Sequence, residues 1–243
     1  MTDLTYRSDV TVKAVRTAAK DDDVLFAARV STVGDETLER ALAAEDTQLS
    51  KADAGLINYL MRDRHGSPFE HNSFTFYVEA PIFVFREFMR HRIASYNEQS
   101  GRYGVMAPTA YTPGPDRALQ QIGKPGAYEF VDGTPEQHEL VQKEVLAATE
   151  QAFEAYHRML DAGIAKEVAR IVLPVSTFSS MYVTLNARSL MNFLSLRTKR
   201  EGSHFPSFPQ REIEMCAEEM EKVFQEAMPV THAAFQRNGR VAP

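Results

Sequence analysis

Two segments of the chain alternate between apolar and polar residues, as a half-buried β-strand does. In residues 71–80, Phe74, Phe76 and Val78 fall on one face, and Thr75, Tyr77 and Glu79 fall on the other. Residues 10–15 alternate over a shorter length, which is typical of an edge strand. The pattern therefore predicts two strands of a sheet that buries one of its faces.

Most of the remaining chain repeats at the helical period, with apolar residues three or four positions apart. Pro81 stands at the first turn of one such segment, and Pro174 ends another. The predicted helices cover residues 21–30, 36–61, 82–90, 135–162, 164–172, 186–197 and 210–228, and a third strand covers 178–185. Strands are few and do not alternate regularly with helices, so we expect an α+β fold. We expect residues 1–243 to form a single domain.

The segment from residue 104 to residue 134 shows no such period. It contains five glycines and four prolines, which interrupt both helices and strands. We expect a long irregular loop here, and long ordered loops often carry function.

Composition and charge exclude several classes of protein. The formal net charge is -6 and the isoelectric point is about 5.7, so we expect no extended nucleic-acid surface. No segment has the roughly 20 apolar residues that a membrane-spanning helix needs, and residues 1–10 lack the apolar run of a signal peptide. We therefore expect a protein that does not bind membranes.

Cys216 is the only cysteine, so the chain cannot form an internal disulfide. A cytoplasmic location is the expectation that follows. Ile213, Cys216 and Met220 recur at helical spacing, which favours a packed core thiol over a catalytic one.

The polar run from Arg90 to Tyr103 is the first candidate for chemistry. Cations at the end of the preceding helix are favoured by its dipole, and a solvated loop would explain the polarity alone. Neither reading requires three arginines with His91 between two of them. Arginines suit phosphate groups, and the neighbouring hydroxyls and amides could complete a nucleotide shell. The run therefore predicts an anion or nucleotide site.

Two histidines flank a Ser-Pro turn between His65 and His71. A metal site is one interpretation, but no cysteine or further acidic cluster lies nearby in the sequence. The alternative is a turn in which Glu70 and His71 satisfy each other. We expect no metal.

Arginines also stand in two segments nearer the C-terminus. Arg170 has apolar neighbours, and a buried arginine must be paired or must hold an anion, so a salt bridge and a ligand contact are equally good interpretations. Arg188, Asn192 and Ser195 form a polar stripe on a helix, whereas Arg197 lies about 180° round from Arg188. Two ligands on two sides, or a bent helix end, would reconcile these positions.

Residues 90–103 resemble the signature of the flavin-dependent thymidylate synthases, Arg-His-Arg-x-x-Ser-x-Asn-Glu-x-Ser-x-Arg-Tyr, and match it at every specified position. The resemblance extends from about Asn58 to Glu214. It includes the family's His-x-Ser-Pro-Phe-Glu-His element at residues 65–71 and its Asn-x-Arg-x-x-x-x-Phe-x-x-x-Arg helix at residues 186–197. Neither a Gly-x-Gly-x-x-Gly fingerprint nor a P-loop is present, so a flavin would bind without the usual glycine-rich turn.

The resemblance implies long helices packed on a small, mostly antiparallel sheet. It also implies a methyltransferase that converts dUMP to dTMP, with 5,10-methylenetetrahydrofolate as carbon donor and NAD(P)H as reductant through FAD. The expected assembly is a homotetramer with active sites at subunit interfaces. No cysteine nucleophile is expected, because Cys216 is a poor candidate.

The resemblance also assigns residues to ligands. The implied FAD contacts are His65, Ser67, Arg90, His91, Arg92, Glu98, Asn186, Ala187, Arg188 and Asn192. The implied dUMP contacts are Glu87, Phe88, Met89, Arg90, Glu98, Gln99, Ser100, Gly101, Arg102, Arg170 and Arg197.

Arg197 receives the main catalytic role in this interpretation. A guanidinium beside the pyrimidine imide would favour its anionic form, and losing such a donor typically costs ~10²–10³-fold in rate. Ser100 could be a nucleophile, but no adjacent base is evident in the sequence to activate it, so we predict a positioning role.

Two features depart from the family's pattern. Glu87 stands where glutamine is more usual, and an ionised carboxylate cannot donate a hydrogen bond. The segment 200–209 is longer and richer in proline than is usual in the family, so we expect the folate site to differ there. The alternatives are a nucleotide-binding protein without catalysis, another flavin reductase, and a helical interaction module, which would not explain the arginine clusters.

Overall fold

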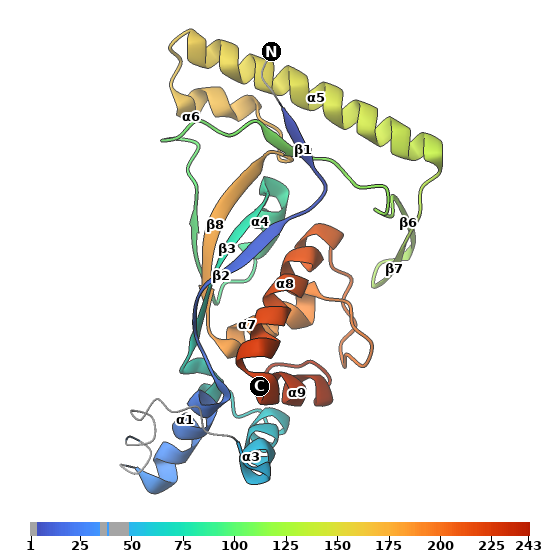
Figure 1. Cartoon of the computed structure of the whole chain (residues 1–243). Helices are drawn as coiled ribbons and strands as arrows, with labels where there is room; N and C mark the ends of the chain where they lie inside the picture. Colours follow the sequence, from blue (N-terminus) through green and yellow to red (C-terminus); the bar gives the residue numbers. More distant parts are fainter. Residues whose placement is uncertain (1–3, 35–37, 39–48) are drawn as a thin grey trace.

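The computed structural model describes residues 4–34, 38 and 49–243, and its class is α+β, as predicted (Figure 1). The strands are β1 (Thr5–Arg7), β2 (Thr11–Ala18), β3 (Ser73–Pro81), β4 (Ser95–Glu98), β5 (Thr109–Tyr111), β6 (Gln120–Lys124), β7 (Ala127–Val131) and β8 (Phe178–Leu185). The α-helices are α1 (Asp21–Val33), α3 (Lys51–Arg62), α4 (Ile82–Phe88), α5 (Pro135–Asp161), α6 (Lys166–Ala169), α7 (Ala187–Arg197), α8 (Arg211–Ala227) and α9 (Pro229–Arg237). Two 3₁₀ turns, η1 (Ser67–Glu70) and η2 (Arg170–Val172), complete the described elements.

The central sheet has four strands in the order β2-β3-β8-β4, and each neighbouring pair is antiparallel. The predicted strand at β3 is confirmed, because Phe74, Phe76 and Val78 are all fully buried. The predicted edge position of β2 is also confirmed. The two central strands thus bury one face, as their alternation indicates.

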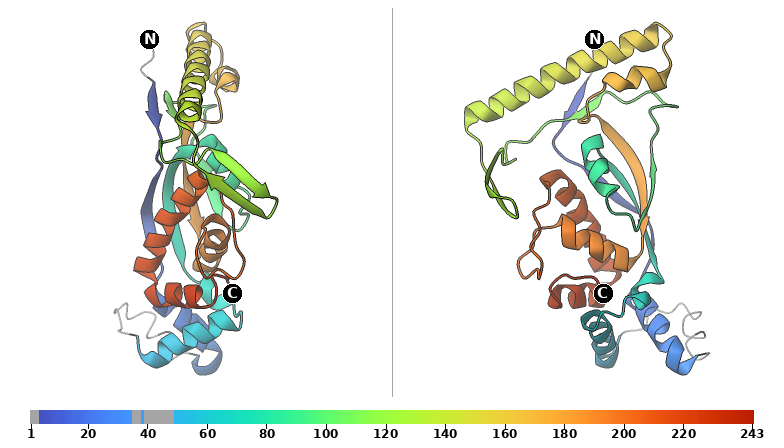
Figure 2. Two further views of the ribbon diagram at one scale, coloured as in Figure 1. Left: turned by 90° about the vertical axis from the view of Figure 1, so that its right-hand side faces the viewer. Right: turned by 180° about the vertical axis from the view of Figure 1, so that it is seen from behind.

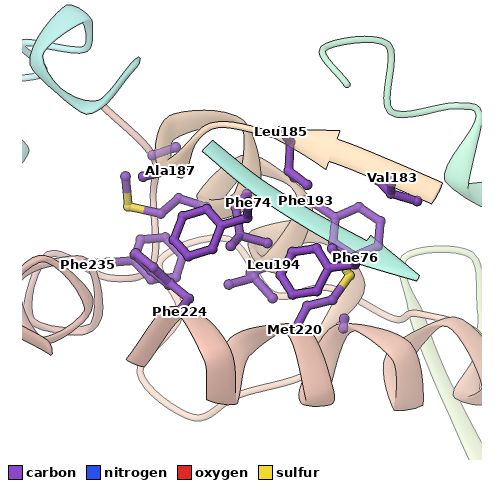
Figure 3. Close-up of a cluster of buried hydrophobic side chains, with 14 of the residues drawn as sticks. Phe74, Phe76, Val183, Leu185, Ala187, Phe193, Leu194, Met220, Phe224 and Phe235 are labelled. Carbon is purple, nitrogen blue, oxygen red and sulfur yellow. The ribbon is translucent and has the colours of Figure 1, made fainter. Parts of the chain in front are cut away.

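The main core lies between this face and the helices that follow β8 (Figure 3). Phe74 and Phe76 of β3 meet Phe193 and Leu194 of α7 and Phe224 of α8. Cys216 is fully buried in the same core, and burial raises the pKa of its thiol, so the predicted packing role is confirmed. The core fixes α7, and therefore its arginines, against the sheet.

The long helix α5 crosses one end of the molecule, away from α3 and α9 (Figures 1 and 2). Phe153 and Tyr156 of α5 form a second, small core with Met106 and Ala169. The Tyr156 hydroxyl accepts a hydrogen bond from the Met106 backbone N–H, 3.0 Å away. This contact anchors the chain directly after the signature segment.

Several predicted elements need correction. The polar run after Arg92 is not only a loop, because residues 95–98 form β4 and pair with β8. The segment 104–134 is not wholly irregular, because β5 pairs with β1 and β6–β7 form a hairpin, whose Gly123 and Gly126 adopt positive φ. The predicted helix 164–172 is divided into α6 and η2. Much of the predicted helix 36–61 lies outside the described residues, although α3 confirms its end.

Candidate functional site

Arg197 ends α7 beside the C-terminal end of α4. Its Nη1 lies 3.4 Å from Oε2 of Glu87, and its Nη2 lies 3.5 Å from the Glu87 carbonyl oxygen. Both side chains are partly exposed, 23% for Arg197 and 30% for Glu87. A donor and an acceptor of opposite charge therefore stand side by side at an accessible edge.

Tyr96 and His91 pack behind this pair. The Tyr96 hydroxyl donates to the carbonyl oxygens of Phe88 and His91, at 2.8 and 2.7 Å, which satisfies backbone acceptors at the end of α4. Burial raises the pKa of Tyr96 to about 12. Burial also lowers the pKa of His91, whose Nε2 is 2.9 Å from the hydroxyl of Ser189 on α7. These contacts join β4, α4 and α7 into one rigid support.

A second group surrounds Gly101. A Cβ atom at this position would lie 2.9 Å from Met106 Sδ and 3.2 Å from Arg170 Cδ, so the arginine stem packs on the glycine backbone. Arg102 donates through Nε to Glu167 at 3.0 Å, and the backbone N–H of Arg102 lies 3.3 Å from the Ser100 hydroxyl. The sequence pointed to residues 90–103 and to Arg170 as separate candidates. The structure brings these two segments together at Ser100, Gly101, Arg102 and Arg170.

Arg170 itself is exposed, so the expectation of a buried arginine is wrong. Its neighbours on α6 and η2 explain this, because Val168, Ile171 and Val172 are also exposed. An apolar sequence environment indicates burial only when the segment faces a core, and this segment does not.

A third group surrounds Arg188, at the other end of α7. Its Nη1 pairs with Glu70, and its Nε donates to the Pro243 carbonyl oxygen at 2.6 Å. A Cβ at position 66 would lie 2.5 Å from the Arg188 guanidinium carbon, so the guanidinium packs directly on the Gly66 backbone and a side chain there would displace it. Glu70 thus pairs with Arg188, and the proposed Glu70–His71 contact is not the one that forms.

The start of α7 is held by two asparagines. Asn186 caps the helix, because its Oδ1 accepts from the Ser189 backbone N–H at 2.9 Å. Asn72 Oδ1 accepts from the Ala187 backbone N–H at 2.7 Å. Asn192 donates to the Arg188 carbonyl oxygen at 3.2 Å. Asn186, Ala187 and Asn192, which were predicted to contact a ligand, therefore form hydrogen bonds that stabilise the first turns of α7.

The remaining predicted residues lie around these groups. His65 packs beside Tyr59 with ring centroids 5.6 Å apart, and Ser67 begins η1 and is exposed. Phe88 is buried and stacks on Phe193, whereas Met89 is 45% exposed. Glu98 lies at the end of β4, opposite Met181, and the Gln99 backbone donates to the Ser180 carbonyl oxygen at 2.8 Å.

The side chains of Arg90, Arg92 and Arg170 form no hydrogen bond or ion pair with the described residues, and all three residues are exposed. Unpaired guanidinium groups are suited to phosphate. The described residues contain no cluster of three or more side chains that would hold a metal ion.

Sequence reasoning missed Glu167 and Tyr96, although each forms a hydrogen bond with a predicted residue: Glu167 with Arg102, and Tyr96 with His91. Tyr96 occupies a position that the signature leaves unspecified, and only the pairing of β4 places its hydroxyl under α4. Glu167 is 65 residues from its partner Arg102, and no local pattern connects the two. Arg102 and Arg197 themselves share no hydrogen bond or ion-pair partner within the described chain.

The fold and these arginine groups define a protein built to bind anionic nucleotides. Residues 14–230 match the family Thy1, described as thymidylate synthase complementing protein. Flavin-dependent thymidylate synthases of Streptomyces coelicolor and Streptomyces avermitilis are 62% and 60% identical to the chain, over 98% of its length and 95% of theirs. The chain belongs to this family of flavin-dependent thymidylate synthases. The predicted methyltransferase activity and the FAD cofactor, with NADPH and methylenetetrahydrofolate as co-substrates, are confirmed.

Solved structures agree with this assignment. Crystal structures of the UMP/dUMP methylase PolB from Streptomyces cacaoi, bound with 5-Br UMP or 5-Br dUMP, align with TM-scores of 0.89 and 0.90. Their sequence identities to the chain are 51% and 52%. The alignments cover 99% of this chain and 99% and 100% of PolB. The small antiparallel sheet and its helices are thus the fold of a nucleotide methylase.

Proposed function

We propose that the group around Arg197 and Glu87 holds the pyrimidine ring of dUMP, and that Arg197 carries the main catalytic role. The supporting observation is that the Arg197 side chain is partly exposed while its guanidinium lies beside Glu87 at the end of α4. A positive charge there favours the deprotonated, anionic form of the pyrimidine imide, and that form is electron-rich at the ring carbon that receives the methylene group. The group around Gly101, with Arg102 and Arg170, would hold the nucleotide phosphate.

The chain also offers residues that fit FAD. Arg90 and Arg92 are exposed and form no ion pair with the residues that the structure describes, and the Arg188 guanidinium packs directly on the Gly66 backbone. Together with His65 and Ser67 they would hold the cofactor's phosphates and ring. Bound FAD supplies the reducing electrons of the reaction. The protein's part is to place the nucleotide and to supply positive charge beside it.

We further propose a homotetramer in which each active site combines residues of more than one subunit. In one protomer, Arg188 and Arg197 contact different partners at opposite ends of α7. An apolar patch beside Arg102 and Arg170 supports an interface there, because large exposed apolar areas mark association surfaces. The patch consists of Tyr103, Val105, Val168, Ile171 and Val172, which are 75%, 51%, 48%, 75% and 39% exposed.

Two further proposals concern the location of the protein and its domain organisation. No helix in the described part of the chain is long and apolar enough to span a bilayer. We propose a cytoplasmic location, which the single buried cysteine supports. We also propose a single domain, because the main core draws residues from α1 through to Ala242.

The direct test is dTMP formation by purified protein given dUMP, methylenetetrahydrofolate and NADPH. Arg197→Ala should lower the turnover number by roughly 10²–10³-fold while the protein keeps its flavin absorbance. Near-normal turnover in this variant would remove Arg197 from the catalytic role.

UMP is a second candidate substrate, because the relative PolB is described as a UMP/dUMP methylase. The same assay with UMP in place of dUMP separates the two. We expect dUMP to have the higher kcat/KM, and the reverse order would make the ribonucleotide the substrate.

A further inference from the structure

A buried ionic cluster joins α8, α9 and the C-terminal segment, outside the site described above. The Glu221 carboxylate of α8 accepts from Arg240 Nη1 at 2.6 Å and from Arg240 Nη2 at 3.0 Å. The same carboxylate lies 3.0 Å from His232 Nε2 on α9. Arg240 is 4% exposed, and His232 is equally enclosed. Burial would raise the pKa of Glu221, but the hydrogen bonds from His232 and Arg240 lower it to about 2.

The cluster reaches the end of α7 through one further contact. Arg240 Nη2 also donates to the Thr198 hydroxyl at 2.9 Å, and that hydroxyl donates to the Leu194 carbonyl oxygen at 2.7 Å. Thr198 is 1% exposed, caps α7 and directly follows Arg197. The Thr198 hydroxyl therefore links the last turn of α7 to the guanidinium of Arg240, which is 42 residues away in the sequence.

The backbone is shaped to deliver this guanidinium. Arg240 has φ of 56° and follows Gly239 with φ of 73°, so two successive residues adopt the left-handed conformation. This conformation is uncommon for residues other than glycine and persists only where the surroundings fix it. The Arg240 backbone N–H donates to the Phe235 carbonyl oxygen at 2.9 Å, and the His204 N–H donates to that of Gly239 at 2.8 Å.

A buried ion pair is by itself weak evidence of stability, because desolvation offsets most of its attraction. In some proteins such a pair fixes one geometry, and here the element that it contacts is the turn that carries Arg197. A second hydroxyl also holds this turn, because Ser207 donates to the Thr198 carbonyl oxygen at 2.6 Å.

We propose that Arg240, held in place by Glu221, is a positioning residue for Arg197 and acts through the hydroxyl of Thr198. The proposal rests on the catalytic role proposed for Arg197. Loss of the link would let the last turn of α7 loosen and the guanidinium move from the pyrimidine. Misplacement by about 1 Å is enough to cost on the order of 100-fold in rate.

Thr198→Val is the sharpest test, since it removes the hydroxyl and keeps the shape of the buried side chain. Thr198→Ser restores the hydroxyl. Thr231→Val is the matched control, because Thr231 is fully buried and its hydroxyl donates to Asp21 at 2.6 Å, away from α7. Three quantities are measured on the full-length flavoprotein: kcat for dTMP formation, the rate of flavin reduction by NADPH, and the melting temperature.

We expect Thr198→Val to lower kcat by roughly tenfold or more, with flavin reduction and melting temperature like those of Thr231→Val. Thr198→Ser should recover most of the lost kcat. A kcat for Thr198→Val within about twofold of wild type, or an equal loss of kcat and flavin reduction, would overturn the proposal. Full turnover by Arg197→Ala would instead overturn the role of Arg197 itself.

Discussion

Glu87 forms an ion pair with Arg197 at the candidate pyrimidine site, where Oε2 of Glu87 lies 3.4 Å from Nη1 of Arg197. The carboxylate competes with an anionic pyrimidine for the guanidinium, because both are negative. Glu87→Gln keeps the side-chain length and removes that charge. We expect dUMP to bind roughly three- to tenfold more tightly to this variant, as measured by calorimetry. Weaker binding would show instead that the carboxylate accepts a hydrogen bond from the nucleotide.

Ser100 lies beside Arg102 without a base to activate it. Its hydroxyl accepts a hydrogen bond from the Arg102 backbone N–H at 3.3 Å, and no His, Asp or Glu side chain of the described chain hydrogen-bonds to it. We expect Ser100→Ala to retain turnover within roughly 100-fold of wild type, which a lost nucleophile would not allow. Single-turnover kinetics with dUMP would measure this. Abolished turnover with intact dUMP binding would support a nucleophilic serine.

At the scale of the elements, the packing of α8 against α9 includes the ionised carboxylate of Glu221. Its pKa is lowered to about 2 from 4.5, and Asp53 on α3 has a pKa lowered to about 2 from 3.8 by its hydrogen bond with Arg29. A lowered pKa in the folded state gives stability that is present above the unfolded value and disappears as the pH falls toward the folded value. Both carboxylates therefore stabilise the fold at neutral pH.

We expect the urea midpoint to fall between about pH 5 and about pH 3, with Glu221 contributing roughly 2 kcal/mol. Glu221→Gln should be less stable than wild type at neutral pH, because it leaves the Arg240 charge unpaired. Its stability should also change less over the same acid range. An identical pH dependence in the two proteins would contradict this account.

The elements themselves were predictable to different degrees. β3, β8, α5, α7 and α8 follow from periods that each segment carries in its own sequence. β4 was not predicted, because its four residues are mostly exposed and have no alternation to reveal them. The hairpin β6–β7 is also largely exposed, so nothing but turn chemistry marks it.

For the whole molecule, the separation of the arginine groups makes a prediction about assembly. If one site combines Arg102 of one subunit with Arg197 of another, Arg102→Ala and Arg197→Ala complement each other in mixed oligomers. Random mixing would restore activity to about a quarter of wild type. The measurement is dTMP formation by the co-expressed pair, with each variant alone as the control. No recovery in verified mixed oligomers would place both arginines in sites formed by one subunit.

The sequence by itself determined the family, the α+β class and most of the candidate residues. Helical and strand periods are local, and a signature such as residues 90–103 requires particular side chains at fixed spacing. Glu87 and Arg197 are 110 residues apart, and their pairing depends on how α4 and α7 pack against one sheet. The exposure of Arg170, the place of Tyr96 under α4 and the inward turn of Arg240 were decided only by tertiary structure. Such contacts arise from the packing of distant segments, which no period in the chain encodes.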